Sequence, residues 1–312
     1  MKNIEIIYHF HLNQRNLHFF TFGLVIAFII EKTALIDILF KIMAIIITMV
    51  IHDQHVHSYY SFDSEQPIEE YLSLAIEAGV SYFVLTDHYD ANYLDKGEDI
   101  SFDIERQHRE LESLQKKYPS IKMLKGIEVG YKPNRIKEIL NKIHKYDFDL
   151  INLSLHESDG IDYFLADTFI ELGIDTVLNI YFQRILEMVN DFDDFDVLCH
   201  LDYGFKTAYR IDPSISISKY EDVISKIMII LIKKDKTFEL NTKVQEYLPL
   251  SHTKYILNLY KRLGGTSITI SSDAHKKDRY RSSFDKYLPL IKEAGFDHLV
   301  YFIKRKRYEL SL

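Results

Sequence analysis

The stretch Asp53-Gln54-His55-Val56-His57 decides how this chain is interpreted, because it places two histidines and an aspartate at alternate positions after an apolar run. Residues two apart on an extended strand share one face, so both imidazoles and the Asp53 carboxylate project together. Neutral imidazole and carboxylate are ligands that suit zinc, iron and manganese. Asp53 could alternatively hydrogen-bond a ligating histidine and fix its tautomer. The stretch therefore predicts one part of a metal site.

Further residues of metal-binding type follow later strand-like segments. The segments are Thr86-Asp87-His88, Gly126-Ile127-Glu128, Ser154-Leu155-His156, Cys199-His200-Leu201-Asp202 and Ser271-Ser272-Asp273-Ala274-His275. Each of these residues alone could be a hydrogen-bonded structural group, but six such segments in one chain predict a multinuclear metal centre. The other His-x-His, His9 with His11, follows no strand-like run. The remaining histidines are interpreted as structural or surface residues: His52, His108, His144, His252 and His298.

Composition limits the classes of partner. The net charge of −8 and the pI near 6.0 argue against a polyanion-binding surface, so no nucleic-acid partner is expected and phosphate contacts should be local. A single cysteine, Cys199, excludes an internal disulfide and favours a reducing compartment, which suggests a cytoplasmic protein. On a strand its side chain would point away from that of His200, so it is interpreted as a buried structural thiol.

The first 48 residues differ from the rest of the chain. Residues 19–30 are uncharged and mostly apolar, but Glu31 and Lys32 interrupt the run. A membrane helix needs about 20 continuous apolar residues, and no small-residue cleavage site marks a signal peptide. Three interpretations stay open: a true start at Met43 or Met49, which we prefer; a membrane-associated helical extension over residues 19–48; and a helix packed on the rest. The expected division is an extension, 1–48, and one domain, 49–312.

From residue 49 onward, short apolar runs alternate with amphipathic segments of helical period. Strands are expected at 49–55, 81–86, 121–127, 148–155, 195–200, 237–241, 266–271 and 298–302. Helices are expected at 67–78, 104–117, 134–146, 180–190, 219–234, 253–263 and 286–294. Repeated βα units favour parallel strands covered by helices. An open doubly wound sheet would gather its site at one switch point, whereas candidate ligands after six strands favour a βα barrel with its site at the C-terminal strand ends.

These motifs, in this order, resemble those of the polymerase and histidinol phosphatase (PHP) superfamily over about residues 49–305. The motifs are Asp-Gln-His-Val-His-Ser, Ser-Phe-Asp-Ser, Leu-Thr-Asp-His, Gly-Ile-Glu, Ser-Leu-His, Cys-His-Leu-Asp, Glu-Leu-Asn and Ser-Asp-Ala-His. The opening His-Ser-x-x-Ser-x-Asp-Ser form and the chain length are most similar to the monofunctional histidinol-phosphatase branch. The resemblance implies a distorted TIM-like barrel of seven βα units, with the run at 298–302 outside it.

The resemblance also implies two to three divalent ions, of zinc, iron or manganese. Their ligands would fall into three groups: His55, His57, Glu128 and Asp273; Glu128, His156 and His200; and Asp63, His88 and His275. Asp63 stands where many relatives have histidine, so the ligands of the third ion depart from the family pattern. Clustered divalent ions activate water and stabilise the oxygens of a phosphoryl transfer, so no protein nucleophile is required.

The implied activity is hydrolysis of L-histidinol phosphate to L-histidinol and phosphate in histidine biosynthesis. Asp202, beside His200, is the candidate general acid or base, or it orients His200. For phosphate binding we expect Arg210 first, then Arg184 and Lys206.

Glu239 and Asn241 are expected to contact the amino-alcohol part of the substrate, although Asn241 could only cap a turn. Two alternatives stay open: a phosphoesterase for nucleotides or other small phosphate esters, and a membrane-tethered metal-binding regulatory module.

Overall fold

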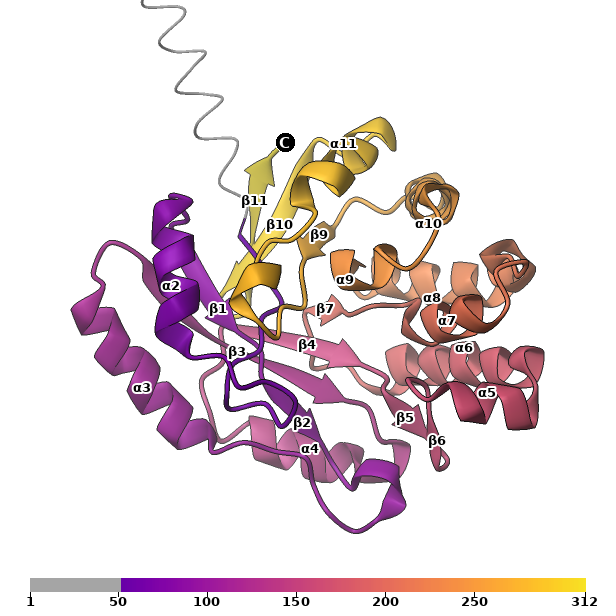
Figure 1. The fold of residues 1–312 in the computed structure, drawn as a ribbon, viewed down its shortest axis with the longest axis horizontal. Helices are drawn as coiled ribbons and strands as arrows, with labels where there is room; N and C mark the ends of the chain where they lie inside the picture. Colours follow the sequence, from indigo (N-terminus) through magenta and orange to yellow (C-terminus); the bar gives the residue numbers. More distant parts are fainter. Residues whose placement is uncertain (1–51) are drawn as a thin grey trace, which may run out of the picture. The chain divides into compact units, whose positions relative to one another are not determined.

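A parallel sheet forms the centre of residues 52–312, which are the residues that this computed structural model describes (Figure 1). The sheet order is β1-β3-β4-β7-β8-β9, with β2 pairing to β3 beyond the end of β1, and every pair is parallel. Its strands are β1 Tyr82–Leu85, β2 His88–Asp90, β3 Lys122–Gly130, β4 Leu150–Ser154, β7 Val197–Leu198, β8 Thr237–Asn241 and β9 Ile268–Ser271. The expectations for residues 1–51 lie outside the described residues.

The opening motif joins the two edges of this sheet. The Thr86 amide donates to the Val56 carbonyl at 2.9 Å, and the His57 amide donates to the Ala274 carbonyl at 2.8 Å. Val56 also forms a parallel bridge with Ala274, just after β9. This segment was expected to be a strand, but it forms only that single bridge. It nevertheless closes the sheet into a barrel, as expected from the distribution of ligands.

The Asp53 side chain forms hydrogen bonds to main-chain amides of the neighbouring segment, where a regular strand would form main-chain bonds. Its carboxylate accepts from the Ser272 amide at 3.0 Å and from the Arg281 amide at 3.1 Å. Asp53 was predicted to fix the tautomer of a ligating histidine. Its carboxylate accepts from the His55 amide at 3.3 Å rather than from an imidazole nitrogen, and its other bonds go to the Arg281 amide and to Ser272, so it supports the backbone of that motif. It therefore holds the opening motif against the loop that follows β9.

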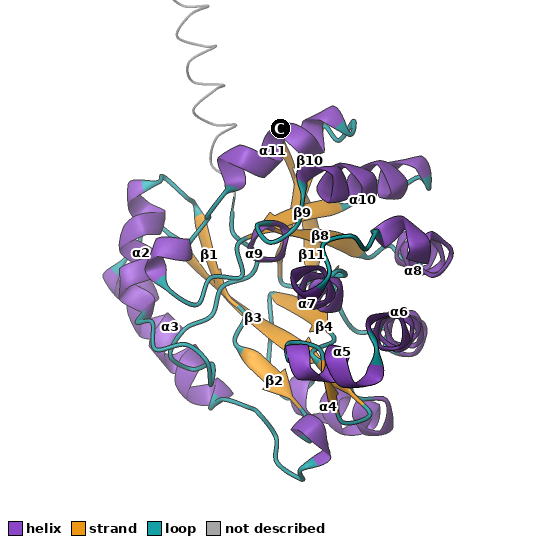
Figure 2. Cartoon of the chain, turned by 45° about the vertical axis from the view of Figure 1, so that its right-hand side comes forward, coloured by secondary structure: helices purple, strands orange, loops and turns teal. Residues whose placement is uncertain are grey.

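Helices surround the sheet (Figure 2). They are α2 Ile68–Glu77, α3 Ile104–Lys117, α4 Ile136–Ile143, α5 Ala166–Leu172, α6 Ile174–Asp191, α7 Tyr203–Ile211, α8 Glu221–Lys233, α9 Thr242–Gln245, α10 Leu250–Arg262 and α11 Phe284–Glu293. Helix α3 has the bounds that the sequence predicts. Asp103 accepts from the Arg106 amide as its N-cap, and Lys116 and Lys117 lie in its last turn, where positive charge is favourable. None of the described helices is long and apolar enough to cross a membrane.

Three helices were not predicted. Helices α5 and α9 have 7 and 4 residues, which is too short for a periodic apolar pattern to be recognised. Helix α7 contains Gly204, a residue that disfavours a helix interior. A Cβ atom at Gly204 would lie 3.1 Å from ring atoms of Tyr181 on α6, so a larger residue would require that ring to shift by a few tenths of an ångström.

Two antiparallel hairpins lie outside the barrel. The small one pairs β5 Glu157–Ser158 with β6 Ile161–Asp162, and the C-terminal one pairs β10 His298–Ile303 with β11 Lys306–Ser311. The expectation that residues 298–302 lie outside the barrel is therefore confirmed. Val300 and Phe302 of β10 are buried against side chains near the beginnings of the barrel strands, namely Val84, Leu124, Leu150 and Val197. The C-terminal hairpin thus closes the barrel end opposite the strand ends that carry the candidate ligands.

Truncating Phe302 should test this closure. Its side chain is 5% exposed, and Phe302→Ala should lower the free energy of unfolding by about 3–5 kcal/mol through lost burial and an unfilled cavity. Phe302→Leu should lower it by less, because it retains most of the apolar volume. Urea unfolding of both variants measures the difference. Equal stability of Phe302→Ala and the unmutated protein would contradict a packing role for the hairpin.

Candidate metal centre

Glu128 on β3 is fully buried at the centre of the candidate site. Five imidazoles each place a ring nitrogen within 3.3 Å of its carboxylate oxygens: His55 at 3.1 Å, His57 at 3.3 Å, His88 at 3.0 Å, His156 at 3.2 Å and His200 at 2.9 Å. A buried carboxylate needs compensating charge or hydrogen bonds. Five histidines exceed what one carboxylate can pair, so this grouping is better suited to positive ions than to hydrogen bonding alone.

The first group of predicted ligands lies on one side of Glu128. The Nε2 atoms of His55 and His57 and the Oδ1 atom of Asp273 all lie within 4.8 Å of one another. Both imidazole Nε2 atoms and the Oε2 atom of Glu128 are buried without a hydrogen-bond partner among the described residues. Buried donor atoms that face one another without bonding fit a divalent ion between them.

The second group lies at the other oxygen of Glu128. Its Oε1 atom is 2.9 Å from His200 Nε2 and 3.2 Å from His156 Nε2. On the far side of the His156 ring, Nδ1 is 2.9 Å from the Asp90 carboxylate, an arrangement that directs Nε2 toward Glu128. Asp90 was missed in the sequence, although it follows His88 by two residues on the same face of β2.

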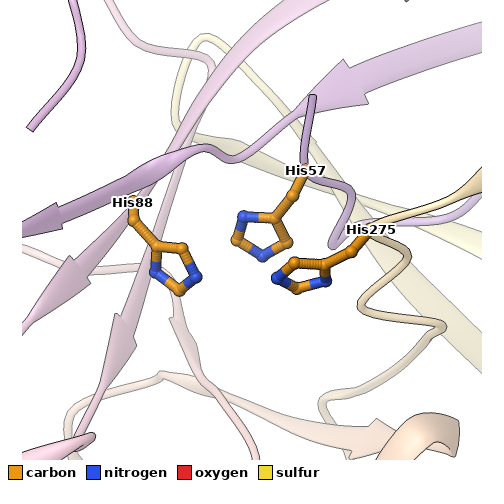
Figure 3. Close-up of side chains that lie close together, drawn as sticks. All are labelled: His57, His88 and His275. Carbon is orange, nitrogen blue, oxygen red and sulfur yellow. The ribbon is translucent and has the colours of Figure 1, made fainter. Parts of the chain in front are cut away.

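The third group combines three imidazoles whose ring nitrogens lie within 4.8 Å of one another, those of His57, His88 and His275 (Figure 3). Asp63 contributes an oxygen 2.9 Å from His275 Nε2 and 3.7 Å from His88 Nε2. The structure therefore brings all nine predicted ligand residues into one site. Asp63 is the most exposed of them, which makes its group the most open to solvent.

Glu239 and Asn241 contact candidate ligands from within the barrel. The Glu239 carboxylate lies 2.8 Å from His55 Nδ1 and accepts from the His200 amide at 2.7 Å. Asn241 accepts from the Val244 amide at 3.1 Å, which caps α9, and its amide group lies 3.4 Å from Asp273. Both residues were predicted to contact substrate. The alternative that Asn241 caps a turn is confirmed, whereas contact of either residue with substrate stays a prediction. Glu239 is 2% exposed and Asn241 is 1% exposed, and both form bonds within the protein.

Ser61 and Asp87 orient His57 in the same manner. The Ser61 hydroxyl lies 2.9 Å from His57 Nδ1 and donates to the Asp87 carboxylate at 2.7 Å. Asp87 also accepts from the Ser58 amide at 2.7 Å. Burial raises the pKa of Asp87, and these donors oppose that shift. Ser58 follows the candidate ligand His57, and Asp87 precedes the candidate ligand His88. Only the contacts in the structure show that Asp87 and Ser61 support His57.

Asp202 has partners other than those predicted. Its carboxylate accepts from Gln245 Nε2 at 2.6 Å and lies 2.7 Å from His252 Nε2, and it does not line the cavity at the metal centre. Its predicted roles as general acid or base, or in orienting His200, are corrected accordingly. Burial opposes ionisation of Asp202, but His252 holds the pKa of its carboxyl below the usual value. It links the loop after β7 to α9 and α10.

Cys199 is buried, as predicted, but its side chain does not point away from the site. Its sulfur lies within 4.8 Å of ligand atoms of His55 and Glu239. The alternation expected for a strand fails because β7 ends at Leu198 and His200 has a φ of +26°. This turn of the backbone allows Cys199 and His200 to face the barrel interior together.

The three residues predicted to bind phosphate differ in their partners in the structure. Arg184 on α6 is paired with Asp159 at 2.5 Å and with Glu187, which leaves it committed to the protein. Arg210 lies with its guanidinium carbon 5.5 Å from the Tyr247 ring. Lys206 is 4% exposed, with Nζ 4.0 Å from the ring of Tyr203, a residue that lines the cavity.

Lys243 on α9 is a cation of the site that the sequence did not indicate. Its Nζ atom lies 3.3 Å from Asp273 Oδ1 and 3.0 Å from His275 Nδ1. It lines a cavity of about 60 Å³ that opens onto Glu128 and the surrounding imidazoles. The Glu-Leu-Asn-Thr-Lys order gives no signal for Lys243, because its position depends on the turn into α9.

Burial and neighbouring charges give two carboxyls and two imidazoles the protonation states that bind metals, whereas the carboxylates around His55, His57 and His156 raise the pKa of those three buried rings. Burial opposes ionisation of Glu128 and Asp273, but His55 beside Glu128 and Lys243 beside Asp273 hold the pKa of each carboxyl well below its usual range. Burial also lowers the pKa of His88 and His275, which keeps those rings neutral. Ionised carboxylates and neutral imidazoles are the forms that coordinate divalent ions.

Comparisons with known proteins agree with this geometry. The PHP domain model matches residues 53–243. A protein described as probable histidinol-phosphatase from Clostridium acetobutylicum is 31% identical over 82% of this chain and 98% of its own length. The histidinol-phosphatase of Lactococcus lactis subsp. lactis is 30% identical over 80% of this chain and 93% of its own.

A crystal structure of histidinol phosphate phosphatase from Lactococcus lactis subsp. lactis, complexed with zinc, L-histidinol and phosphate, superposes with a TM-score of 0.69. It is 28% identical to this chain, and the match covers 83% of this chain and 99% of that structure. The α/β barrel fold expected from the sequence is therefore confirmed. The chain belongs to the PHP domain family, within the group that includes these histidinol-phosphatases.

Proposed function

We propose that this chain is a metal-dependent phosphoric monoester hydrolase that converts L-histidinol phosphate to L-histidinol and phosphate. The observation that carries the proposal is the convergence of nine candidate ligand residues, with Glu128 at their centre. The similarity to histidinol-phosphatases over nearly their full length supports the substrate. The single cysteine supports a cytoplasmic location.

The donor set fits two to three divalent ions of zinc, iron or manganese. Imidazole nitrogens and carboxylate oxygens suit these metals. His55, His57, Glu128 and Asp273 would hold one ion; Glu128, His156 and His200 a second; and Asp63, His88 and His275 a third. When bound, such ions supply an activated water at neutral pH and positive charge for the phosphoryl oxygens.

The cations beside the cavity would bind and orient the phosphate. Lys243 faces the cavity directly, and Lys206 lies behind Tyr203 with no ion pair in the part of the chain that the structure describes. A buried ammonium without a carboxylate partner is suited to an anionic ligand. Arg210, one helical turn after Lys206, adds charge at longer range. The acid–base work predicted for Asp202 is not part of this proposal.

A substrate panel on metal-loaded protein tests the proposed function. L-histidinol phosphate should be hydrolysed with a kcat/KM well above those of AMP and p-nitrophenyl phosphate. Removal of metal with a chelator should abolish turnover, and added zinc or manganese should restore it, because the bound ions would supply the activated water. Comparable low rates on all three esters would contradict the substrate assignment, and undiminished activity after verified metal removal would contradict the metal mechanism.

Glu239→Gln should weaken metal binding, because Glu239 contacts candidate ligands. The loss of its charge beside His55 Nδ1 should lower metal affinity or kcat/KM by about 10- to 100-fold, the usual effect of altering a residue that orients a ligand. Competition with a chromophoric chelator measures the affinity. Glu293→Gln, which alters an exposed ion pair with Lys254, is the matched control and should behave as the unmutated protein does. Equal metal affinity in both variants would contradict the supporting role.

The activity should weaken at alkaline pH through Lys206. Burial lowers the pKa of Lys206 to about 8, so its positive charge is present below that pH and is lost above it. The KM for L-histidinol phosphate should therefore rise as the pH increases through about 8. Lys206→Arg should remove this rise, because a guanidinium stays charged throughout. Initial rates from pH 6 to 10 measure it, and the same alkaline rise in both proteins would assign it to another group.

A further inference from the structure

Phe62 is an unusual residue for the wall of a metal centre. Its side chain is 64% exposed, yet it lines the cavity and its ring centroid lies 5.5 Å from that of His88. Most phenylalanines of the described residues are buried in the barrel and its helices. Because small-molecule sites are lined mainly by apolar and aromatic side chains, a phenylalanine on the wall of this polar cavity is placed to contact the organic part of a bound molecule.

The loop around Phe62 is held in place by the site itself. Ser61 bonds to Asp87 at 2.7 Å, and the Ser64 hydroxyl donates to the His275 carbonyl at 2.9 Å. The amides of Ser61 and Ser64 close two successive turns, with bonds to the carbonyls of Ser58 at 2.9 Å and Ser61 at 3.3 Å. The backbone on both sides of Phe62 is therefore fixed, which positions its ring at the mouth.

Two tyrosines complete an aromatic mouth. Tyr93 and Tyr203 line the same cavity as Phe62. The Tyr93 hydroxyl donates to the Asp162 carboxylate at 3.0 Å, which fixes this ring, and Tyr203 packs at 5.1 Å from the His200 ring. The mouth thus offers flat apolar surfaces, whereas the interior offers imidazoles, carboxylates and Lys243.

The cavity is large enough for the phosphate group of a substrate but not for its organic part. Its volume of about 60 Å³ leaves room for roughly four to six water molecules, at about 10–15 Å³ for each. That space suits a phosphate group beside the ligands but not the remainder of an amino alcohol. The organic part of a bound ester must therefore lie at the mouth, in reach of the aromatic rings.

We propose that Phe62 is a specificity-determining residue that packs against the heteroaromatic ring of the leaving alcohol. The inference rests on the proposed function and adds how that site selects its ester. Aromatic rings favour offset or edge contacts with other flat rings, and a protonated imidazole adds attraction to the ring face. An aliphatic phosphate ester gains neither contact.

Phe62→Ala tests the inference, with kcat/KM measured for L-histidinol phosphate and for glycerol 2-phosphate. The ratio of the two values should fall about tenfold, mainly through a higher KM for L-histidinol phosphate, as expected for loss of one aromatic contact. Phe62→Tyr should keep the ratio, because it keeps the ring. Ile170→Ala, which truncates a side chain exposed to the same 64% on α5, is the matched control and should also keep it.

The outcomes separate the two proposals. An unchanged ratio in Phe62→Ala, or an equal loss on both esters, would overturn the role of Phe62 alone. Absence of L-histidinol phosphate turnover by the unmutated, metal-loaded protein would overturn the proposed function and the inference together. Metal content measured on each variant distinguishes a changed mouth from a damaged metal centre, since Phe62 lies next to the ligand Asp63.

Discussion

The buried carboxylate of Glu128 is the constraint on which the centre of this protein depends. Five imidazoles from four segments surround it at 2.9–3.3 Å. Such a group is costly to bury unless the charges are balanced, because the interior solvates ions poorly. Positive ions held between these donors would provide that balance, so metal binding and the stability of this end of the barrel are coupled.

The barrel separates stability from chemistry along its axis. Near the strand beginnings, Val84, Leu124, Leu150 and Val197 pack against the C-terminal hairpin as an apolar plug. Toward the strand ends the interior becomes polar, and residues such as Asp53 and Glu239 join neighbouring segments by side-chain hydrogen bonds. An apolar end supplies burial energy that the polar end lacks, which agrees with the general placement of active sites in βα barrels.

Two candidate ligands adopt backbone conformations that are uncommon outside glycine. His200 has a φ of +26° and Asp273 has a φ of +49°. Such conformations carry a cost of roughly 1–3 kcal/mol each and persist where the surrounding structure fixes them. Here the His200 amide bonds to Glu239, and Asp273 lies beside Lys243. The strain is therefore located where side chains must leave the regular alternation of a strand to reach the centre.

The sequence by itself determined the parallel βα order and the barrel, because the alternation of apolar runs and helical segments depends on local spacing, and its resemblance to the PHP superfamily implied the nine ligand candidates. Tertiary structure decided the rest, because it depends on residues far apart in the chain. Asp90 and Lys243 became site residues only when β2 and the turn into α9 were placed. Asp53, Asp202 and Glu239 became internal supports through partners that include Arg281, Gln245 and His55, which lie 228, 43 and 184 residues away. Hydrogen bonds between residues so far apart produce no periodic pattern in the sequence, so these partners are known only from the tertiary structure.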